Sequence, residues 1–235
     1  YYVYDKADRL IFTQDGEQRG RGQWLFSIPD VFGRPVLSGT CSDTLSVHQS
    51  VVKVDLASTA DGIYKGYNIQ VDGINKQLSS PAILSVNYYD NYAFLGKNSF
   101  PAYGYDPAKE SEGFGKRYDE GKGYEAKGQL TGSITSTFGS DKELYSVMYY
   151  DNRGRLIQTQ SNNHLDGKET EYLAYNFTGQ ATKKLHTHIK GSNTTRELYT
   201  YAYDHAGRLT DTKHTLDSKF ESVLAKNKYE TSWEV

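Results

Sequence analysis

Hydrophobic and polar residues alternate along most of this chain, and the alternation is clearest from Leu144 to Gln160. Two stretches with a period of two residues, LYSVMYY and RLIQTQ, flank the polar tetrapeptide Asp151-Asn152-Arg153-Gly154. Successive side chains of a β-strand point to opposite faces, and Tyr, Val and Met suit a half-buried pleated surface. The segment therefore predicts a β-hairpin.

The polar tetrapeptide has the chemistry of a tight turn. An Asp carboxylate accepts hydrogen bonds from backbone N–H groups just ahead of it, and Gly adopts a positive φ without steric penalty. We therefore expect Asp151 to cap the turn and Gly154 to occupy its left-handed position.

The same order of strand, capping residue and turn recurs at Asp5, Asp30, Asn176 and Asp204. The steps from Asp5 to Asp30 and from Asp151 to Asn176 are both 25 residues, and the step from Asn176 to Asp204 is 28. Such periods indicate a repeat architecture. A single hairpin cannot bury its own face, so neighbouring hairpins must pair into a continuous antiparallel sheet.

The residues expected to build these turns share one order, which is Tyr, Asp or Asn, two variable residues, Gly, and then Arg. They are Tyr4, Asp5 and Arg9; Asp30, Gly33 and Arg34; Tyr150, Asp151, Gly154 and Arg155; Asn176 and Gly179; and Tyr203, Asp204, Gly207 and Arg208. Asp8 replaces the Gly of the later copies, and Asp tolerates a left-handed conformation better than most residues.

The exchange of Asp for Asn at Asn176 suits turn capping, so we assign these residues a structural role and no catalytic one. Each Arg is expected to bond a carboxylate or carbonyl group of a neighbouring turn.

The hairpins are expected over residues 1–40 and 129–216, and the segments between and after them differ in character. Residues 41–95 contain Ser, Thr and Val strands with Asp61-Gly62 and Asp72-Gly73, which are hairpin signals, so we expect an inserted β-meander that ends in a Tyr-Tyr-Asp strand. Residues 96–128 are rich in Gly and charge and predict a surface loop.

Two further patterns concern the ends of elements. Pro29 and Pro35 predict edge or irregular pairing, because Pro has no N–H for a ladder. Residues 217–235 form a tail in which Phe220, Val223 and Leu224 have weak helical spacing. The chain begins and ends close to repeat-like segments, and we expect it to be a piece of a longer polypeptide.

Charge and composition narrow the functional classes. The 27 Lys and Arg against 29 Asp and Glu give a net charge of −2 without a long basic stripe, so neither nucleic acid nor an anionic membrane surface is a favoured partner. No apolar run reaches the length of about 18 residues that a membrane span needs. The 21 Tyr residues exclude the aromatic-poor composition of a disordered chain.

Candidate reactive residues are few. Cys41 is the single cysteine, so no intramolecular disulfide forms, and no cue points to a partner His. His186 and His188 share one strand face and could begin a metal site, but no third ligand is evident. No combination of residues satisfies the requirements of a catalytic site, so we expect neither an enzyme nor a cofactor or metal.

The repeated turns resemble the YD repeats of the Rhs family of large bacterial surface or secreted proteins. Tyr149-Tyr150-Asp151 with Gly154-Arg155-Leu156, and Tyr203-Asp204 with Gly207-Arg208-Leu209, carry the resemblance most fully. It implies an elongated, twisted or spiralling sheet that can form a hollow shell around a C-terminal toxin domain, or an adhesion scaffold. It also implies an extracellular or cell-surface location, with the rest of the same polypeptide as partner.

One hallmark of that family is missing. Its self-cleaving core motif has the order Asp-Pro-x-Gly-Leu, whereas Asp106-Pro107 is followed here by Ala108-Lys109. A self-processing peptidase is therefore the least supported hypothesis.

Two functional hypotheses follow. The first is a non-enzymatic structural module of a shell or surface scaffold, and the alternative is a carbohydrate-binding or adhesion module that uses exposed rows of Tyr. Cross-strand packing of the Tyr side chains would favour the first, and solvent-facing aromatic rings on a concave face would favour binding of glycans.

Overall fold

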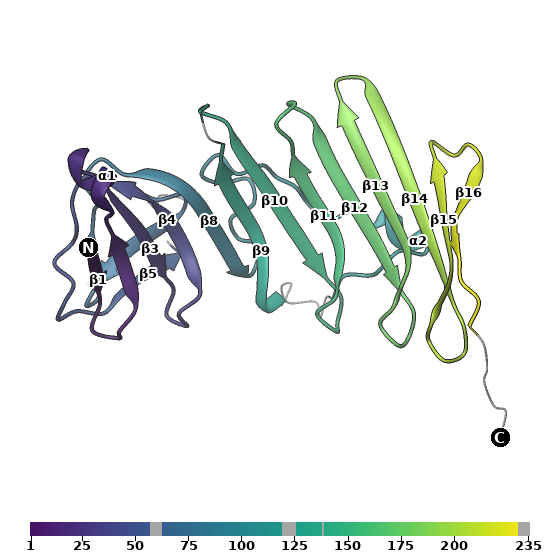
Figure 1. The fold of residues 1–235 in the computed structure, drawn as a ribbon, viewed down its shortest axis with the longest axis horizontal. Coiled ribbons are helices and arrows are strands. Elements are labelled where there is room, and N and C mark those ends of the chain that lie inside the picture. Colours follow the sequence, from purple (N-terminus) through teal and green to yellow (C-terminus); the bar gives the residue numbers. More distant parts are fainter. Residues whose placement is uncertain (57–62, 119–125, 138, 230–235) are drawn as a thin grey trace. The chain divides into compact units, whose positions relative to one another are not determined.

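The computed structural model describes residues 1–56, 63–118, 126–137 and 139–229 (Figure 1). The chain is 52% strand and 4% helix, so the prediction of an all-β fold with antiparallel pairing is confirmed. The Asp61-Gly62 dipeptide and the last residues of the predicted tail lie outside the described residues. No described helix is long and apolar enough to cross a membrane.

The strands follow one another through short connections. In chain order they are β1 (Tyr2–Tyr4), β2 (Leu10–Thr13), β3 (Trp24–Pro29), β4 (Pro35–Cys41), β5 (Val52–Leu56), β6 (Tyr67–Val71), β7 (Ile74–Lys76), β8 (Ala82–Asp90), β9 (Ala126–Ser136), β10 (Glu143–Tyr150), β11 (Leu156–Asn162), β12 (Lys168–Tyr175), β13 (Ala181–Lys190), β14 (Asn193–Tyr203), β15 (Leu209–Leu216) and β16 (Glu221–Lys226). Two short helices, α1 (Gly16–Gly20) and α2 (Ala108–Ser111), interrupt them.

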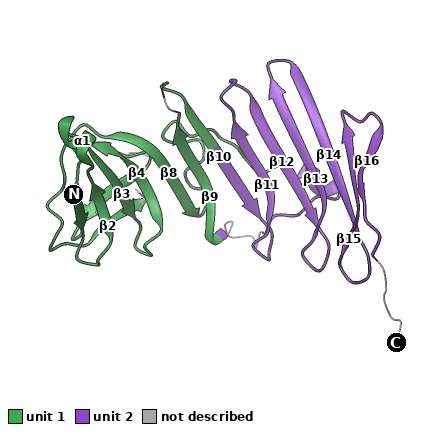
Figure 2. Cartoon of the chain, viewed as in Figure 1, with its two compact units in different colours: residues 1–104, 127–145 green, residues 105–126, 146–235 purple. Residues whose placement is uncertain are grey.

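Thirteen of these strands form one open sheet in the order β1-β2-β3-β4-β8-β9-β10-β11-β12-β13-β14-β15-β16. Strands β5, β6 and β7, which lie between β4 and β8 in the sequence, form a separate antiparallel meander. The chain divides into two compact units, Tyr1–Gly104 with Lys127–Tyr145 and Tyr105–Ala126 with Ser146–Val235 (Figure 2).

The core of the first unit contains an aromatic cluster. The ring of Tyr88 in β8 stacks on Phe94 with 4.2 Å between centroids and meets the edge of Phe100 at 5.5 Å. The Tyr88 hydroxyl donates to the carbonyl of Lys65, and the Tyr67 hydroxyl donates to that of Asn87. These two hydroxyls tie the meander to the main sheet while their rings stay buried.

In the second unit one face of the sheet is covered and the other is solvated. Val147, Tyr149, Gln158, Tyr172 and Leu185 lie on the covered face and are buried. Residues 105–118, called here the strap, supply that cover. The opposite face carries half-buried charge pairs, such as Lys184 with Glu171. This division is typical of antiparallel sheets, and the alternation of buried and half-buried residues along β12 and β13 follows from it.

Residues 96–128 are predicted as a surface loop, but several of them pack against the rest of the fold. Phe100 is buried in the first unit, and β9 already begins at Ala126. In the strap, a Cβ on Gly115 would lie 2.3 Å from Cγ2 of Ile157, so the missing side chain lets the backbone lie against the sheet. Gly therefore marks close approach here rather than a free loop.

One expectation about the ends of elements needs correction, and a second holds in one of its two forms. The weak helical spacing after residue 216 does not mark a helix, because Glu221–Lys226 pairs with β15 as a strand. Phe220 is 93% exposed, so these apolar residues face no core that would require a helix. Pro29 and Pro35 face each other beside a register shift, which fits irregular pairing, but β3 and β4 are interior strands.

Gly39 provides a test of the pairing between β4 and β8. A Cβ at Gly39 would lie 2.2 Å from the carbonyl oxygen of Ala82 and 2.8 Å from Cζ of Phe26. We expect Gly39→Ala to lower the free energy of unfolding by about 3 kcal/mol, because backbone has to move. Urea denaturation measures it, and Gly20→Ala, with nothing within 4 Å, is the control. Equal stability of the two variants would contradict this packing.

Candidate functional site

The predicted turn at Asp151 is closed by a fixed set of hydrogen bonds. Oδ1 of Asp151 accepts from the backbone N–H groups of Arg153 and Arg155 at 2.8 and 3.0 Å. The Asp151 N–H donates to the carbonyl of Arg155, and the Gly154 N–H donates to the carbonyl of Asp151, both at 3.0 Å. One carboxylate oxygen thus satisfies two donors that the strand ladder leaves unpaired.

The turns at Asp5, Asp30, Asn176 and Asp204 have the same geometry. In each, Oδ1 accepts from the N–H four residues on, at 3.0, 2.9, 2.9 and 2.8 Å respectively. The position three residues after the capping residue always has a positive φ, which is 58° at Asp8, 82° at Gly33, 70° at Gly154, 94° at Gly179 and 78° at Gly207. The turns therefore place a Gly or an Asp where a left-handed backbone is needed.

One further turn of this kind was missed from the sequence. Oδ1 of Asn163 accepts from the N–H groups of Leu165 and Gly167, both at 2.9 Å, and Asp166 has a φ of 60°. This turn joins β11 to β12. The signal was an Asn three residues before an Asp-Gly pair, but Gly167 stands where the other turns have Arg or Gln.

The side chain of the exit arginine also bonds the capping residue of its own turn. Nε of Arg9, Arg34, Arg155 and Arg208 donates to Oδ2 of the capping Asp of its own turn, at 3.1, 2.7, 2.6 and 2.7 Å. In the first turn burial raises the pKa of Asp5, but hydrogen bonds from the side chain and backbone of Arg9 outweigh that effect and hold the pKa below its usual value.

The exit residue also reaches the next turn. Arg9 donates to the carbonyl of Asp30 at 3.4 Å, and Arg155 donates to that of Asn176 at 3.1 Å. Gln180 replaces Arg in the fourth turn and donates to the carbonyl of Gly207 at 2.5 Å. These neighbouring turns are therefore joined side chain to backbone, as predicted, through Arg9 and Arg155.

Tyrosines complete this contact, and two of them, Tyr175 and Tyr203, stand directly before a capping residue. The guanidinium groups of Arg34, Arg155 and Arg208 lie over the rings of Tyr89, Tyr175 and Tyr229, at 4.3, 4.7 and 4.5 Å from the centroids. The hydroxyls of these tyrosines donate to the carbonyls of Pro35, Leu156 and Leu209 at 3.1, 2.7 and 2.9 Å, and that of Tyr203 donates to Ala181 at 2.8 Å. We call this set of contacts within and between turns the turn ladder.

Two predicted tyrosines differ from these. Tyr4, in the first turn, is 45% exposed. Tyr150 is half-buried, and burial raises the pKa of its hydroxyl.

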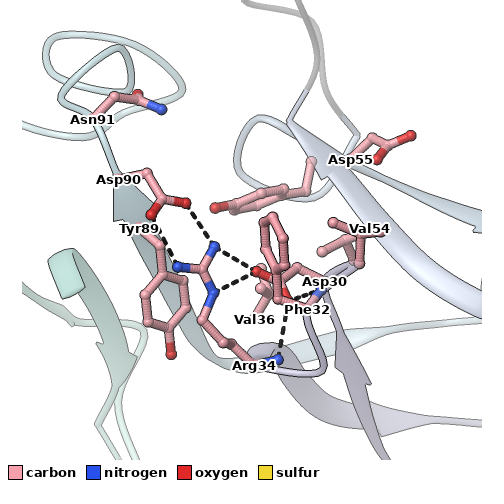
Figure 3. A pocket seen from close by; sticks show the side chains of 11 residues that line it. Asp30, Phe32, Arg34, Val36, Val54, Asp55, Tyr89, Asp90 and Asn91 are labelled. Carbon is pink, nitrogen blue, oxygen red and sulfur yellow. Dashed lines mark hydrogen bonds and ion pairs between the residues drawn. The ribbon is translucent and has the colours of Figure 1, made fainter. Parts of the chain in front are cut away.

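Arg34 extends the turn ladder to a second carboxylate (Figure 3). Besides Asp30, its two terminal nitrogens donate to Oδ1 and Oδ2 of Asp90 at 3.0 and 2.6 Å. Asp90 ends β8, the strand predicted to lack a Gly-Arg exit of its own. The hydrogen bonds from Arg34 hold the pKa of Asp90 below its usual value, and the Gly128 N–H adds a bond of 2.7 Å. One arginine thus serves two carboxylates.

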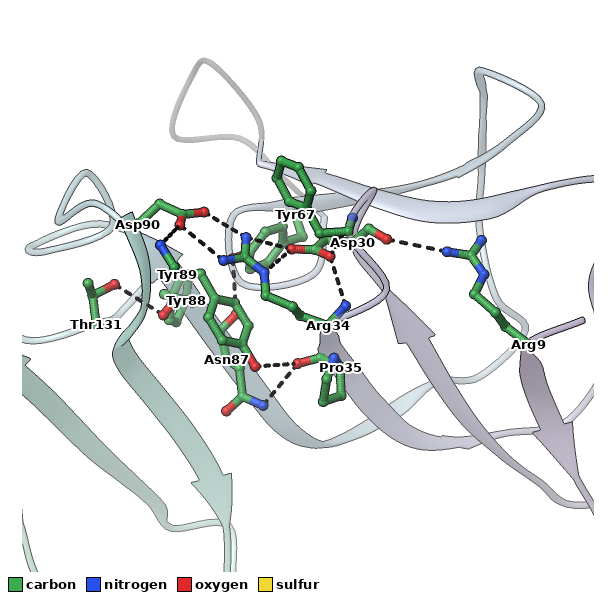
Figure 4. A network of polar contacts seen from close by, with 12 residues as sticks. Arg9, Asp30, Arg34, Pro35, Tyr67, Asn87, Tyr88, Tyr89, Asp90 and Thr131 are labelled. Atoms are coloured by element: carbon green, nitrogen blue, oxygen red, sulfur yellow. Dashed lines mark hydrogen bonds and ion pairs between the residues drawn. The ribbon is translucent and has the colours of Figure 1, made fainter. Parts of the chain in front are cut away.

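Figure 4 shows two further hydrogen bonds of the turn ladder in the first unit. Arg9 donates to the carbonyl of Asp30, and the hydroxyl of Tyr89 donates to that of Pro35. The first turn also holds the meander. Oδ2 of Asp5 accepts from the Val52 N–H at 3.2 Å, and Arg9 donates to the Val52 carbonyl at 2.5 Å.

A small pocket of about 170 Å³ lies beside Arg34 and is lined by Phe32, Tyr67, Tyr89 and Asp55 (Figure 3). Sites for small molecules are typically about 300–1,000 Å³. Arg34, the cation in its wall, is already bonded to Asp30 and Asp90. The pocket therefore lacks the volume for a typical ligand, and its arginine is already bonded.

His186 and His188 share one strand face, as predicted, and both bind Glu169. Nε2 of His186 lies 2.9 Å from Oε2, and Nδ1 of His188 lies 2.6 Å from Oε1. Burial raises the pKa of Glu169, but hydrogen bonds from Asn163, His188 and His186 outweigh it and leave the pKa lowered. Among the described residues no group of three His, Cys, Asp or Glu is arranged to hold a metal.

Cys41 and Asp106, the other two candidate residues, are held by hydrogen bonds to neighbouring groups of the fold. Cys41 is buried, its thiol donates to the carbonyl of Asp43 at 3.1 Å, and burial raises its pKa, which disfavours the thiolate. Oδ1 of Asp106 accepts from the Ala108 N–H at 3.0 Å just before α2, while its own N–H donates to Gln158 at 3.2 Å. Asp106-Pro107 thus anchors the strap.

No family model matches this sequence, and no curated protein matches it significantly. Among solved structures, the crystal structure of TcdB2-TccC3-Cdc42 is similar at 11% identity and a TM-score of 0.26, over 97% of this chain and 13% of that chain.

The crystal structure of TcdB2-TccC3-TEV is similar at 11% identity and a TM-score of 0.23, over 95% of this chain and 11% of that chain. The chain thus spans about an eighth of the length of the chains it matches.

Replacing Arg34 tests the ladder. Arg34→Gln leaves the carboxylates of Asp30 and Asp90 without their cation, and we expect it to lower the free energy of unfolding by about 2 kcal/mol at neutral pH. Because the pKa of Asp90 is lowered in the folded chain, its contribution is full above its ordinary pKa near 4 and is lost as pH falls through the lowered value. The difference between wild type and variant should therefore shrink as the pH falls below the ordinary pKa of an Asp, about 4.

The control for this experiment is Arg21→Gln. Arg21 pairs with Glu17 at the surface, where both side chains are more than two-thirds exposed, at 67% and 74%, so its loss should cost less than about 0.5 kcal/mol. Chemical denaturation at several pH values measures both. A pH-independent difference for Arg34→Gln would contradict the proposed ion pair.

The left-handed turn position gives a second test. Gly33 has a φ of 82° and open space around its Cα, so Gly33→Ala should lower the free energy of unfolding by about 1 kcal/mol through backbone strain alone. The converse change, Asp8→Gly, should raise it by about 0.5 kcal/mol, because Asp8 holds a φ of 58°. Opposite signs in urea denaturation are expected, and equal signs would refute the assignment.

Proposed function

We propose that this chain is a non-enzymatic structural repeat module of a large Rhs/YD-repeat protein, as part of a β-sheet shell or a surface scaffold outside the bacterial cell. The observation that carries the proposal is the turn ladder. Its exit residues Arg9, Arg155 and Gln180 each bond one turn to the next, which suits a sheet extended by repetition.

The chemistry of the ladder supports a structural role over a catalytic one. In the fourth turn Asn176 and Gln180 replace Asp and Arg, and Nδ2 of Asn176 donates to Oε1 of Gln180 at 2.8 Å. The Gln180 N–H still donates to Oδ1 of Asn176 at 2.9 Å. An amide pair preserves the turn but could not replace a carboxylate in acid–base catalysis.

The same contacts weaken the alternative of a carbohydrate-binding or adhesion module. Stacking on a sugar needs an open aromatic face, but Tyr89 and Tyr175 are covered by Arg34 and Arg155. The hydroxyl of Tyr203 is bonded to the sheet. The scaffold is therefore the better supported function.

The resemblance to Rhs proteins suggests the setting of such a scaffold. We propose that its partners are neighbouring hairpins of the same polypeptide, and that the sheet encloses a C-terminal toxin domain or takes part in cell contact. The hairpins themselves are then interchangeable, whereas residues of a specific active site would not be.

Deleting one repeat tests this interchangeability. Removing Lys184–Asp211, one 28-residue period, joins Lys183 to Thr212. Lys183 pairs with Thr200 and Thr200 with Lys213, so the joined strand keeps its faces and can pair with β12 as β13 did. We expect a folded chain with strand circular dichroism and cooperative urea unfolding.

The control is removal of Leu185–Asp211, which is one residue shorter. It joins Lys184 to Thr212, both of which lie on the same face in the native sheet, so every later side chain moves to the opposite face. We expect this variant to aggregate or unfold. The scaffold proposal would be contradicted if the two deletion variants behaved equally. It would also be contradicted if the native chain bound a sugar saturably and Arg34→Gln abolished that binding.

A further inference from the structure

A second groove, of about 430 Å³, lies in the second unit between the strap and strands β13, β14 and β15. In Figure 1 the strap helix α2 is drawn beside these strands. The volume falls within the range of about 300–1,000 Å³ that is typical of small-molecule sites. None of the turn-ladder residues lines this groove.

The groove is positively charged although the chain as a whole carries −2. Lys109, Lys183 and Arg196 line it against one acid, Glu112. Glu112 is committed to Lys109, whose Nζ lies 2.6 Å from Oε1.

Two of the cations therefore have no carboxylate partner within the described part of the chain. Nζ of Lys183 makes a long contact of 3.4 Å with the carbonyl of Glu112 and lies 5.9 Å from the ring of Phe114. The guanidinium of Arg196 is on an exposed residue and has no hydrogen-bond or ion-pair partner among the residues that the structure describes. Both have donors free for an anion.

The floor between these cations is apolar. Leu185 and Leu198 are paired across β13 and β14, and Thr215 lies opposite Leu198 on β15. Leu185 is 8% exposed, and Leu198 and Phe114 are half-buried. A bound apolar group would therefore exchange water for two aliphatic side chains and an aromatic ring.

We infer that this groove binds a small organic carboxylate with an apolar body. A planar guanidinium matches a carboxylate in a two-bond geometry, so Arg196 is the anchor and Lys183 adds a second charge. A neutral sugar fits less well, because the one acidic side chain that lines the groove, Glu112, is already bonded to Lys109. The inference concerns residues outside the turn ladder and goes beyond the scaffold function.

Phenylacetate is a suitable probe, and phenylacetamide is its neutral counterpart of nearly the same shape. Isothermal titration calorimetry on the whole chain should show saturable binding of phenylacetate below about 10 mM and binding of phenylacetamide about tenfold weaker. Arg196→Gln should weaken phenylacetate about tenfold and leave phenylacetamide unchanged. Leu198→Ser should weaken both ligands alike.

The matched control is Lys190→Gln, which removes one charge from β13 outside the groove and should leave both affinities unchanged. Circular dichroism verifies that each variant is folded. Equal affinity for phenylacetate and phenylacetamide would overturn the inference, as would equal effects of Lys190→Gln and Arg196→Gln. Glucuronate that binds as tightly as phenylacetate would overturn the apolar part and assign the groove to acidic sugars.

Discussion

The capped turn, in which one carboxylate binds its own backbone and its own exit arginine, is the contact on which the main sheet depends. Asp151 satisfies the N–H groups of Arg153 and Arg155 with one oxygen and the side chain of Arg155 with the other. The arginine is thereby held in one orientation, from which it reaches the carbonyl of Asn176. A local turn thus becomes a connection between hairpins, and its repetition sets where each strand pair begins.

This arrangement explains how a chain with a mean hydropathy of −0.71 forms an ordered sheet. Tyrosine supplies apolar area through its ring and a donor through its hydroxyl, so Tyr175 both covers Arg155 and bonds Leu156. Only one face of the second unit needs cover, and the strap provides it. The polar opposite face carries pairs such as Lys184 with Glu171, at 2.7 Å. The anionic-ligand groove that we infer lies where strap and sheet leave a space.

Much of the turn architecture was readable from the sequence. The alternation before Asp151 and the Asp or Asn followed by Gly predicted where strands end, because these are local properties of a few consecutive residues. Distant pairings were not readable. Nothing in the spacing assigns Arg34 to Asp90, which lies 56 residues away, and the missed turn at Asn163 lacks the arginine that marks the others. The exposed tail residues were misread because a short apolar run fits either period.

The sequence by itself determined that this protein is an all-β array of hairpins with capped turns, since turn chemistry and a period of two act within one hairpin. Only the tertiary structure decided which turn each exit arginine meets, that the glycine-rich strap lies on a sheet face, and that Lys183 and Arg196 border one apolar groove. Those outcomes depend on strand order and on close approach at residues such as Gly115, where the absence of a side chain decides what can pack. Contacts between residues far apart in the chain are created by the fold, and no local pattern encodes them.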